Sequence, residues 1–302
     1  MVYWDDIGAH IGKATVDAFW LSHPAVRARV NERISGDARR GPLDWFATRM
    51  AGRLPFSEGL SVGCGTGGLE RDLIRRGICR AVTGIDTAQP PLDYAKERAR
   101  EEGLADAIRY ERADAMTFLD AGRTFGAVFF HAALHHFERP ADLLGRVARA
   151  LCPGGILYLD DFIGPSMNTW SWRRLFLPNL VYYLLPPKVR RPGLVRSPVN
   201  PEDPTEAVAA GEILPALDTH FRILERRDYG GQLTSLIYPN LARPDGTPRS
   251  PAPERFDRAV RLILRIEDRL MRHRVWTRSR PFYAVIIAEA KEAARPPTAS
   301  ET

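Results

Sequence analysis

The 302-residue chain has little of what marks secreted, membrane-spanning or metal-binding proteins. Its three cysteines, Cys64, Cys79 and Cys152, are too few for a disulfide framework and lack the spacing of a metal site. No apolar run reaches the ~18 residues of a membrane-spanning helix, and the first residues, M-V-Y-W-D-D, are acidic where a signal peptide is basic. We therefore expect reduced thiols, no metal ligands and a cytoplasmic location.

The chain is mildly basic, with a formal net charge of +6. A basic surface favours anionic partners, but the sequence has no zinc finger, RNA-binding signature or basic leucine zipper. Nucleic acid is therefore not an expected partner. An aromatic and basic stretch, W-S-W-R-R-L-F-L-P-N-L-V-Y-Y-L-L-P-P-K, leaves peripheral contact with a membrane open. Nothing in the sequence indicates an oligomeric state.

Strand and helix patterns alternate through the middle of the chain. Apolar strands are expected at residues 60–63, 81–86, 108–111, 127–131 and 156–162, with helices at 69–76, 91–102 and 140–151 between them. Such alternation predicts an α/β fold with a doubly wound, mostly parallel, Rossmann-like sheet that is covered by helices on both faces.

Other segments flank this core. Residues 1–53 are expected to form an N-terminal helical extension that contributes to a lid, and residues 54–163 to form the cofactor-binding core. Residues 164–205, rich in proline and aromatics, are expected to be an inserted helical lid. Residues 206–292 would complete the sheet and add a further lid helix, and residues 293–302 would be a disordered tail. The lid segments are expected to govern acceptor choice.

A glycine cluster, L-S-V-G-C-G-T-G-G, ends the first strand. Gly63, Gly65 and Gly68 fit the G-x-G-x-x-G spacing of a dinucleotide site, whereas Gly63, Gly65 and Gly67 fit the tighter spacing of S-adenosylmethionine (SAM) sites. The loop alone does not distinguish NAD from SAM. Asp86, at the end of the second strand, suits the ribose of either cofactor, while Asp114 in R-A-D-A is placed to meet an adenine and favours SAM.

These motifs, together with A-L-H-H-F and L-C-P-G-G-I-L, resemble the class I SAM-dependent methyltransferases of the small-molecule type. The resemblance implies that Gly63, Cys64, Gly65, Thr66 and Gly67 approach the methionyl part of SAM, with His131 beside it. It further implies that Asp86 binds the ribose and that Asp114 with Ala115 binds the adenine. Many members carry an acid where this chain has Ser61. The later segments resemble a bacterial branch associated with secondary-metabolite and polysaccharide biosynthesis.

The resemblance implies methyl transfer from SAM to an oxygen or nitrogen atom of a small-molecule or sugar-derived acceptor. His135, His136 and Asp161 are the candidate catalytic residues, because a hydroxyl acceptor must lose a proton and these side chains follow strand ends at the ligand edge. We expect only one of the adjacent histidines to face the acceptor, and only one of Asp160 and Asp161 to enter the cleft.

Three other functions remain open at this point. A nicotinamide-dependent oxidoreductase would use the same kind of glycine loop but lacks the R-A-D-A stretch. A non-catalytic SAM-binding protein would keep the cofactor residues without needing a base. A methyltransferase acting on a lipid-linked substrate at the membrane surface would explain the aromatic and basic insert.

Overall fold

A seven-stranded sheet forms the centre of the molecule, in the order β3-β2-β1-β4-β5-β7-β6. The computed structural model describes residues 19–198, 203, 205–244, 251–273 and 281–291. The strands are β1 (Phe56–Val62), β2 (Cys79–Asp86), β3 (Ile108–Arg112), β4 (Phe125–His131), β5 (Leu151–Phe162), β6 (Phe221–Gly230) and β7 (Tyr283–Ala290). Strands β1 to β5 pair in parallel, and β7 runs antiparallel between β5 and β6. The predicted mostly parallel α/β sheet is confirmed.

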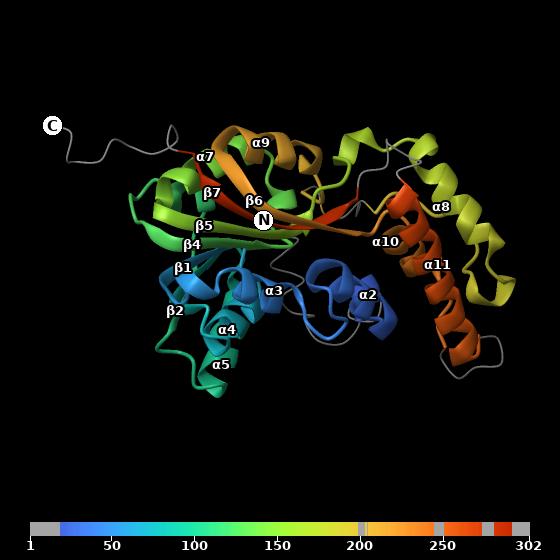
Figure 1. Cartoon of the computed structure of the whole chain (residues 1–302), viewed down its shortest axis with the longest axis horizontal. Coiled ribbons are helices and arrows are strands. Elements are labelled where there is room, and N and C mark those ends of the chain that lie inside the picture. Colours follow the sequence, from blue (N-terminus) through green and yellow to red (C-terminus); the bar gives the residue numbers. More distant parts are fainter. Residues whose placement is uncertain (1–18, 199–202, 204, 245–250, 274–280, 292–302) are drawn as a thin grey trace.

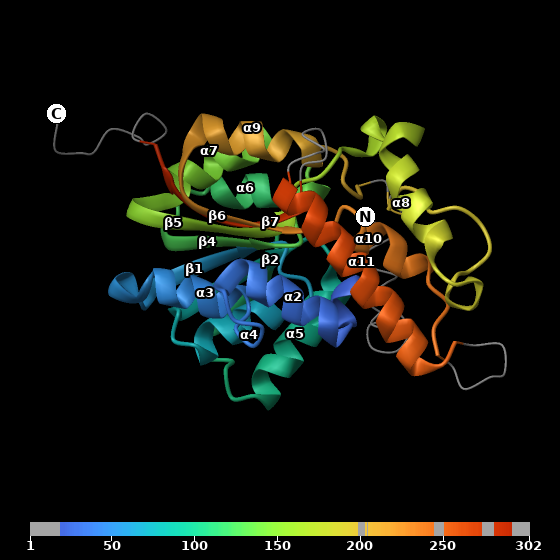
Figure 2. The same ribbon diagram turned by 45° about the vertical axis from the view of Figure 1, so that its right-hand side comes forward.

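Helices cover both faces of this sheet (Figures 1 and 2). One face carries α3 (Pro42–Arg49), α4 (Gly68–Arg75) and α5 (Gln89–Glu101), and the other carries α6 (Ala115–Leu119), α7 (Pro140–Ala150) and α9 (Ile213–His220). The central strands are therefore apolar on both faces, as in other covered parallel sheets, and their side chains form the main core.

The remaining helices lie beyond the carboxyl ends of the parallel strands (Figure 1). They are α2 (Pro24–Ser35), α8 (Trp172–Leu184), α10 (Thr234–Ile237) and α11 (Pro253–His273). Arg33 on α2 joins α11 through contacts of 3.2 Å with both Glu267 and Asp268, and buried Glu267 also accepts the backbone N–H of Leu233 at 2.8 Å. Short 3-10 turns connect the elements: Trp20–Ser22, Ala51–Arg53, Leu134–His136, Met167–Thr169, Pro187–Val189, Ala210–Glu212 and Tyr238–Asn240.

The N-terminal extension contributes to the core as well as to the region beyond the sheet. Phe46 on α3 is fully buried, and its ring lies 5.8 Å from that of Phe129 and 5.0 Å from that of Tyr158. Helix α3 therefore closes one face of the sheet, which a detachable lid would not do. The expected tail at residues 293–302 lies outside the described residues. Among the helices that the structure describes, none is long and apolar enough to cross a membrane.

Candidate active site

The glycine loop follows β1 and is held to the end of β2. The backbone N–H groups of Gly63 and Cys64 both donate to the carbonyl of Ile85, at 2.9 and 3.0 Å. Gly63 and Gly67 have φ angles of +69° and +74°, and a Cβ on Gly67 would lie 2.3 Å from the Tyr110 hydroxyl. Only glycine fits these backbone conformations without strain. The loop therefore has no side chains at these positions to cover its backbone at the strand ends.

A cavity of about 330 Å³ lies over this loop. It is lined by nearly all of the predicted cofactor residues: Gly63, Cys64, Gly65, Thr66, Asp86, Asp114, Ala115 and His131. Gly67 is the exception, because it packs under Tyr110 instead of facing the cavity. Burial raises the pKa of the Cys64 thiol well above its usual value, so Cys64 lines the cavity as an uncharged group.

Asp86 and Asp114, the two predicted carboxylates of this cavity, also accept hydrogen bonds from the backbone around it. Asp86 accepts the backbone N–H of Gly65 at 2.9 Å and that of Ala88 at 3.0 Å, one on each carboxylate oxygen. Asp114 caps α6 by accepting the backbone N–H of Thr117 at 2.9 Å. Each carboxylate oxygen can accept a further hydrogen bond, so both residues retain the capacity to bind a ligand hydroxyl or amine.

A second, larger cavity of about 720 Å³ lies on the other side of the loop, between the loop, α2, α3 and α4. Gly63, Cys64, Thr66 and His131 line both cavities, so the two meet at the glycine loop and the end of β4. Buried Glu70 lines the second cavity, together with five arginines from the surrounding segments: Arg27, Arg39, Arg71, Arg75 and Arg76.

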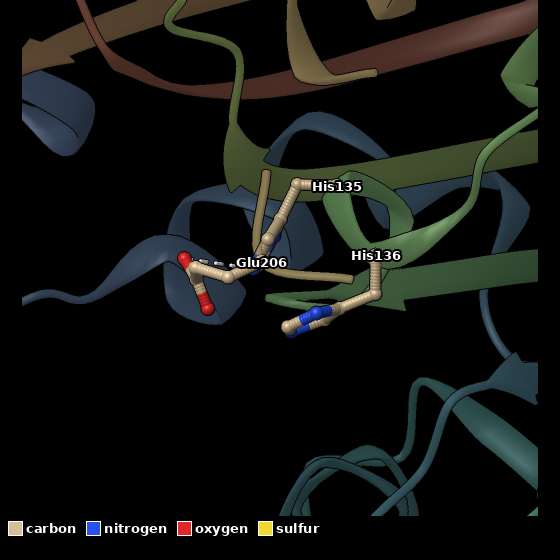
Figure 3. Close-up of side chains that lie close together, drawn as sticks. All are labelled: His135, His136 and Glu206. Carbon is tan, nitrogen blue, oxygen red and sulfur yellow. Dashed lines mark ion pairs between the residues drawn. The ribbon is translucent and has the colours of Figure 1, made fainter. Parts of the chain in front are cut away.

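His135 and His136 lie together on the 3-10 turn that follows β4 (Figure 3). Their ring centroids are 4.0 Å apart. The tight turn directs both rings to the same side, where Glu206 also lies, but His135 is buried and only His136 of the two lines the smaller cavity. Each of these three residues offers one atom that could bind a metal ion, and these three atoms lie within 4.8 Å of one another.

The Asp161 carboxylate stabilises this turn through hydrogen bonds. It is fully buried and accepts the backbone N–H groups of Ala133 at 3.0 Å and Leu134 at 2.7 Å, and it contacts His135 Nδ1 at 2.5 Å. Burial raises the pKa of Asp161, but the charge of His135 and these hydrogen bonds outweigh it and lower that pKa. Burial likewise lowers the pKa of His135, and the charge of Asp161 outweighs it and raises that pKa. The two side chains form a buried ion pair.

His136 is held by a second chain of hydrogen bonds. The hydroxyl of Thr205 donates its single proton to Asp203 at 2.6 Å, so a hydrogen bond with His136 Nδ1, 3.1 Å away, requires the ring proton on Nδ1. The backbone of Thr205 also interacts with the His136 ring. Burial, followed by the charge of His135, lowers the pKa of His136 to about 4, so His136 is neutral near pH 7.

Asp160 points away from Asp161, as side chains alternate along a strand. It lines the larger cavity, accepts the Tyr229 hydroxyl at 2.8 Å and lies 3.2 Å from His131 Nδ1. Sequence reasoning missed Glu70, Asp203, Thr205 and Glu206. Glu70 had a signal, because it occupies the same apolar face of its helix as Leu73.

Residues 60–159 match the protein family described as Methyltransferase domain. This segment is therefore similar to known methyltransferase domains. The chain shares 34% identity over 120 residues with the 27-O-demethylrifamycin SV methyltransferase of Amycolatopsis mediterranei, covering 38% of this chain and 43% of the relative. It also matches a ubiquinone biosynthesis O-methyltransferase of Caulobacter vibrioides, with 35% identity over 124 residues that cover 40% of this chain and 48% of the relative.

These matches leave much of each protein uncompared, since the chain spans about half or less of the length of these curated relatives. A crystal structure of the [4+2]-cyclase SpnF superimposes with a TM-score of 0.48 and 21% identity, over 82% of this chain and 79% of the other.

SAM is the cofactor of the methyltransferase domain, and the residues present fit it. Gly63 has no room for a side chain, because a Cβ there would lie 2.8 Å from the Ala133 side chain. The backbone of the glycine loop is therefore uncovered at this position. Asp86 and Asp114 line the smaller cavity, and the larger one continues past the loop. Asp86 would hold the ribose, Asp114 and Ala115 the adenine, and the loop the methionyl part.

Proposed function

We propose that the protein is a SAM-dependent methyltransferase that acts on an oxygen or nitrogen atom of a small-molecule acceptor, sugar-derived acceptors included. The observation that carries this proposal is the meeting of the cofactor cavity with a buried histidine pair at the ligand edge of the sheet. SAM supplies an electrophilic methyl group, and the protein must position the acceptor and remove its proton when the acceptor is a hydroxyl.

His136 is the proposed general base. It lines the cofactor cavity, whereas His135 is nearly covered. In this scheme Thr205 holds the proton on Nδ1, Nε2 takes the proton of the acceptor, and Asp203 behind Thr205 favours the charged ring that forms. In this scheme His136 is the catalytic residue.

His135 and Asp161 act through His136 in this scheme. Asp161 fixes the turn that carries both histidines, and a protonated His135 opposes the protonation of its neighbour. Both are positioning residues, which assigns different roles to the three predicted catalytic residues. Glu206 lies beside both histidines, and burial raises its pKa.

The proposal is tested by incubating the protein with SAM and a panel of hydroxyl- and amine-bearing acceptors and measuring S-adenosylhomocysteine (SAH) by mass spectrometry. Acceptor-dependent release of SAH is expected. Tight SAH binding without turnover on any acceptor would instead support the non-catalytic SAM-binding protein. A thermal shift with NAD and none with SAM would support the oxidoreductase.

A second candidate, action on a lipid-linked acceptor at a membrane surface, is favoured by α8. Four large apolar side chains on this helix are exposed at four-residue spacing and therefore share one face: Trp172 (72% exposed), Phe176, Leu180 and Leu184 (71% exposed). Exposed Arg173, Lys188 and Arg191 lie on α8 or just after it. An apolar helix face with basic neighbours fits an anionic membrane surface.

Co-sedimentation with vesicles tests this candidate. The protein should sediment with vesicles rich in phosphatidylglycerol and not with neutral phosphatidylcholine vesicles. The double variant Trp172→Ser, Phe176→Ser should lose this binding. Tyr94→Ser, which alters an exposed apolar residue on α5, is the matched control and should retain it. Absence of the wild-type protein from the anionic pellet would exclude the membrane candidate while leaving methyl transfer intact.

A further inference from the structure

Glu70 is a buried carboxylate that forms no salt bridge with the residues that the structure describes. It sits in the first turn of α4 and is 0% exposed, and the uncharged Ser61 hydroxyl is the side-chain hydrogen-bonding group beside its carboxylate. Leaving a buried charge without a partner is costly, so such a group is either protonated or reserved for a ligand. Its side chain lines the larger cavity beside the glycine loop.

The nearest basic groups are already engaged by other acceptors. Arg71 donates to the Thr66 carbonyl at 2.9 Å and lies 3.0 Å from Glu102, and His131 lies 3.2 Å from Asp160. Ser61, which lines the cavity from β1, is uncharged. Among the described residues near the loop, these basic side chains are therefore already paired with other groups, and neither forms a salt bridge with Glu70.

The other carboxylates of this cavity are occupied. Asp160 accepts the Tyr229 hydroxyl and pairs with His131, and Asp44 accepts the Gly41 N–H at 3.0 Å and pairs with Arg76. Half-buried Asp72 lies 3.8 Å from Arg75. A cation entering the cavity from the glycine loop would therefore meet Glu70 as the unpaired acceptor.

We infer that Glu70 binds the α-ammonium group of the methionyl moiety of SAM and SAH, with the Ser61 hydroxyl beside it. The inference rests on the proposed binding of SAM at the glycine loop and names the residue that holds the amino-acid end of the cofactor. An ammonium offers three N–H donors, and the two oxygens of Glu70 are positioned to accept from it at the wall of the cavity that joins the adenosine cavity at Gly63 and Cys64.

The protonation of Glu70 provides an independent signature. Burial raises its pKa to about 7, against the smaller opposing effects of Ser61, His131 and Arg71. Cys64 and Tyr110, which also interact electrostatically with it, stay uncharged near pH 7 because burial raises both of their pKa values. A bound ammonium requires the carboxylate, so SAH binding should release a proton from Glu70 below pH 7 and weaken as the pH falls.

Calorimetry with two ligands tests the inference. SAH carries the ammonium, and 5′-methylthioadenosine has the adenosine and sulfur without it. Glu70→Gln should weaken SAH binding roughly tenfold to a hundredfold, the loss expected for a hydrogen bond to a charged group, and should leave methylthioadenosine affinity unchanged. Proton release at pH 6.5, measured in buffers of different ionisation enthalpy, should disappear in the variant.

Two further measurements separate ligand binding from structural damage. Removing an unpaired buried charge should leave the Tm of the ligand-free protein unchanged or raise it, while the rise in Tm caused by SAH should shrink. Ser61→Asp in the Glu70→Gln background, which returns a carboxylate to the neighbouring position, should restore SAH affinity in part.

An equal loss of affinity for both ligands, or unchanged SAH affinity in Glu70→Gln, would overturn the inference. Failure of the wild-type protein to bind either ligand would instead overturn the proposed binding of SAM.

Discussion

Replacing Asp161 by asparagine should destabilise the fold strongly and in a pH-dependent way. The Asp161 carboxylate accepts the N–H groups of Ala133, Leu134 and Phe162 and contacts His135 Nδ1. An asparagine side chain has a single acceptor oxygen and presents an NH₂ group where the second carboxylate oxygen stood. The variant therefore leaves buried donors unpaired and His135 without its counterion.

The expected loss follows from breaking a buried ion pair by removing one partner, which costs about 3 to 5 kcal/mol in the free energy of unfolding. The sign of its pH dependence follows from the two pKa shifts. Asp161 has a lowered pKa in the folded protein, so its contribution is present above its unfolded pKa and is lost as the pH falls through the folded value. His135 has a raised pKa, so its contribution is present below its unfolded pKa and is lost as the pH rises through the folded value.

Urea unfolding of the wild type and Asp161→Asn between pH 4 and pH 9 is the assay. The difference in unfolding free energy should be largest on the acidic side of neutrality, where both groups are charged, and should shrink as His135 loses its proton. Asp160→Asn is a neighbouring control that leaves the His135 pair untouched. A difference that stays constant across this range, or a variant as stable as the wild type, would refute the ion-pair account.

Three further predictions concern the proposed chemistry. Thr205→Val should lower turnover roughly tenfold with SAH affinity retained, because His136 loses the group that fixes its tautomer, while Thr205→Ser should keep turnover; equal activity of the two variants would contradict this. Turnover on a hydroxyl acceptor should rise as the pH passes the raised pKa of His135, since loss of that charge makes His136 a stronger base, and His135→Gln should lack this limb of the profile. Removal of divalent ions with EDTA should leave turnover unchanged, because the proton on His135 and the raised pKa of Glu206 reduce the negative charge around the histidine pair without an ion. Restoration of activity by an added metal would show that the histidine pair binds one.

The sequence predicted the parts of the site that depend on local order. The glycine loop and Asp86 follow directly from consecutive strands, so their convergence at one sheet edge is a consequence of parallel pairing. The sequence did not reveal that His135 and His136 lie on a 3-10 turn, which brings their rings to within 4.0 Å of each other. Their roles as base or positioning residues stay predictions.

The partners of the histidines could not be inferred from the sequence. Asp203, Thr205 and Glu206 lie more than sixty positions further along the chain, and only tertiary folding brings Thr205 to His136 across 69 positions. The expected lid at residues 164–205 was assigned from its composition. That composition does not reveal that α8 keeps Trp172 exposed while Tyr182 is buried.

The pairing of β5 with β7 has a consequence for how this protein can diversify. Phe162 and Tyr283 are partners in the ladder, and the Ile163 N–H donates to the Phe282 carbonyl at 2.7 Å. The chain between these positions contains α8, α11 and Thr205 and also contributes the edge strand β6, which pairs with β7. We expect that a chimaera joined at these two positions would exchange this whole segment, β6 included, between related enzymes, and with it the acceptor preference, while the glycine loop and its cofactor contacts stay in place.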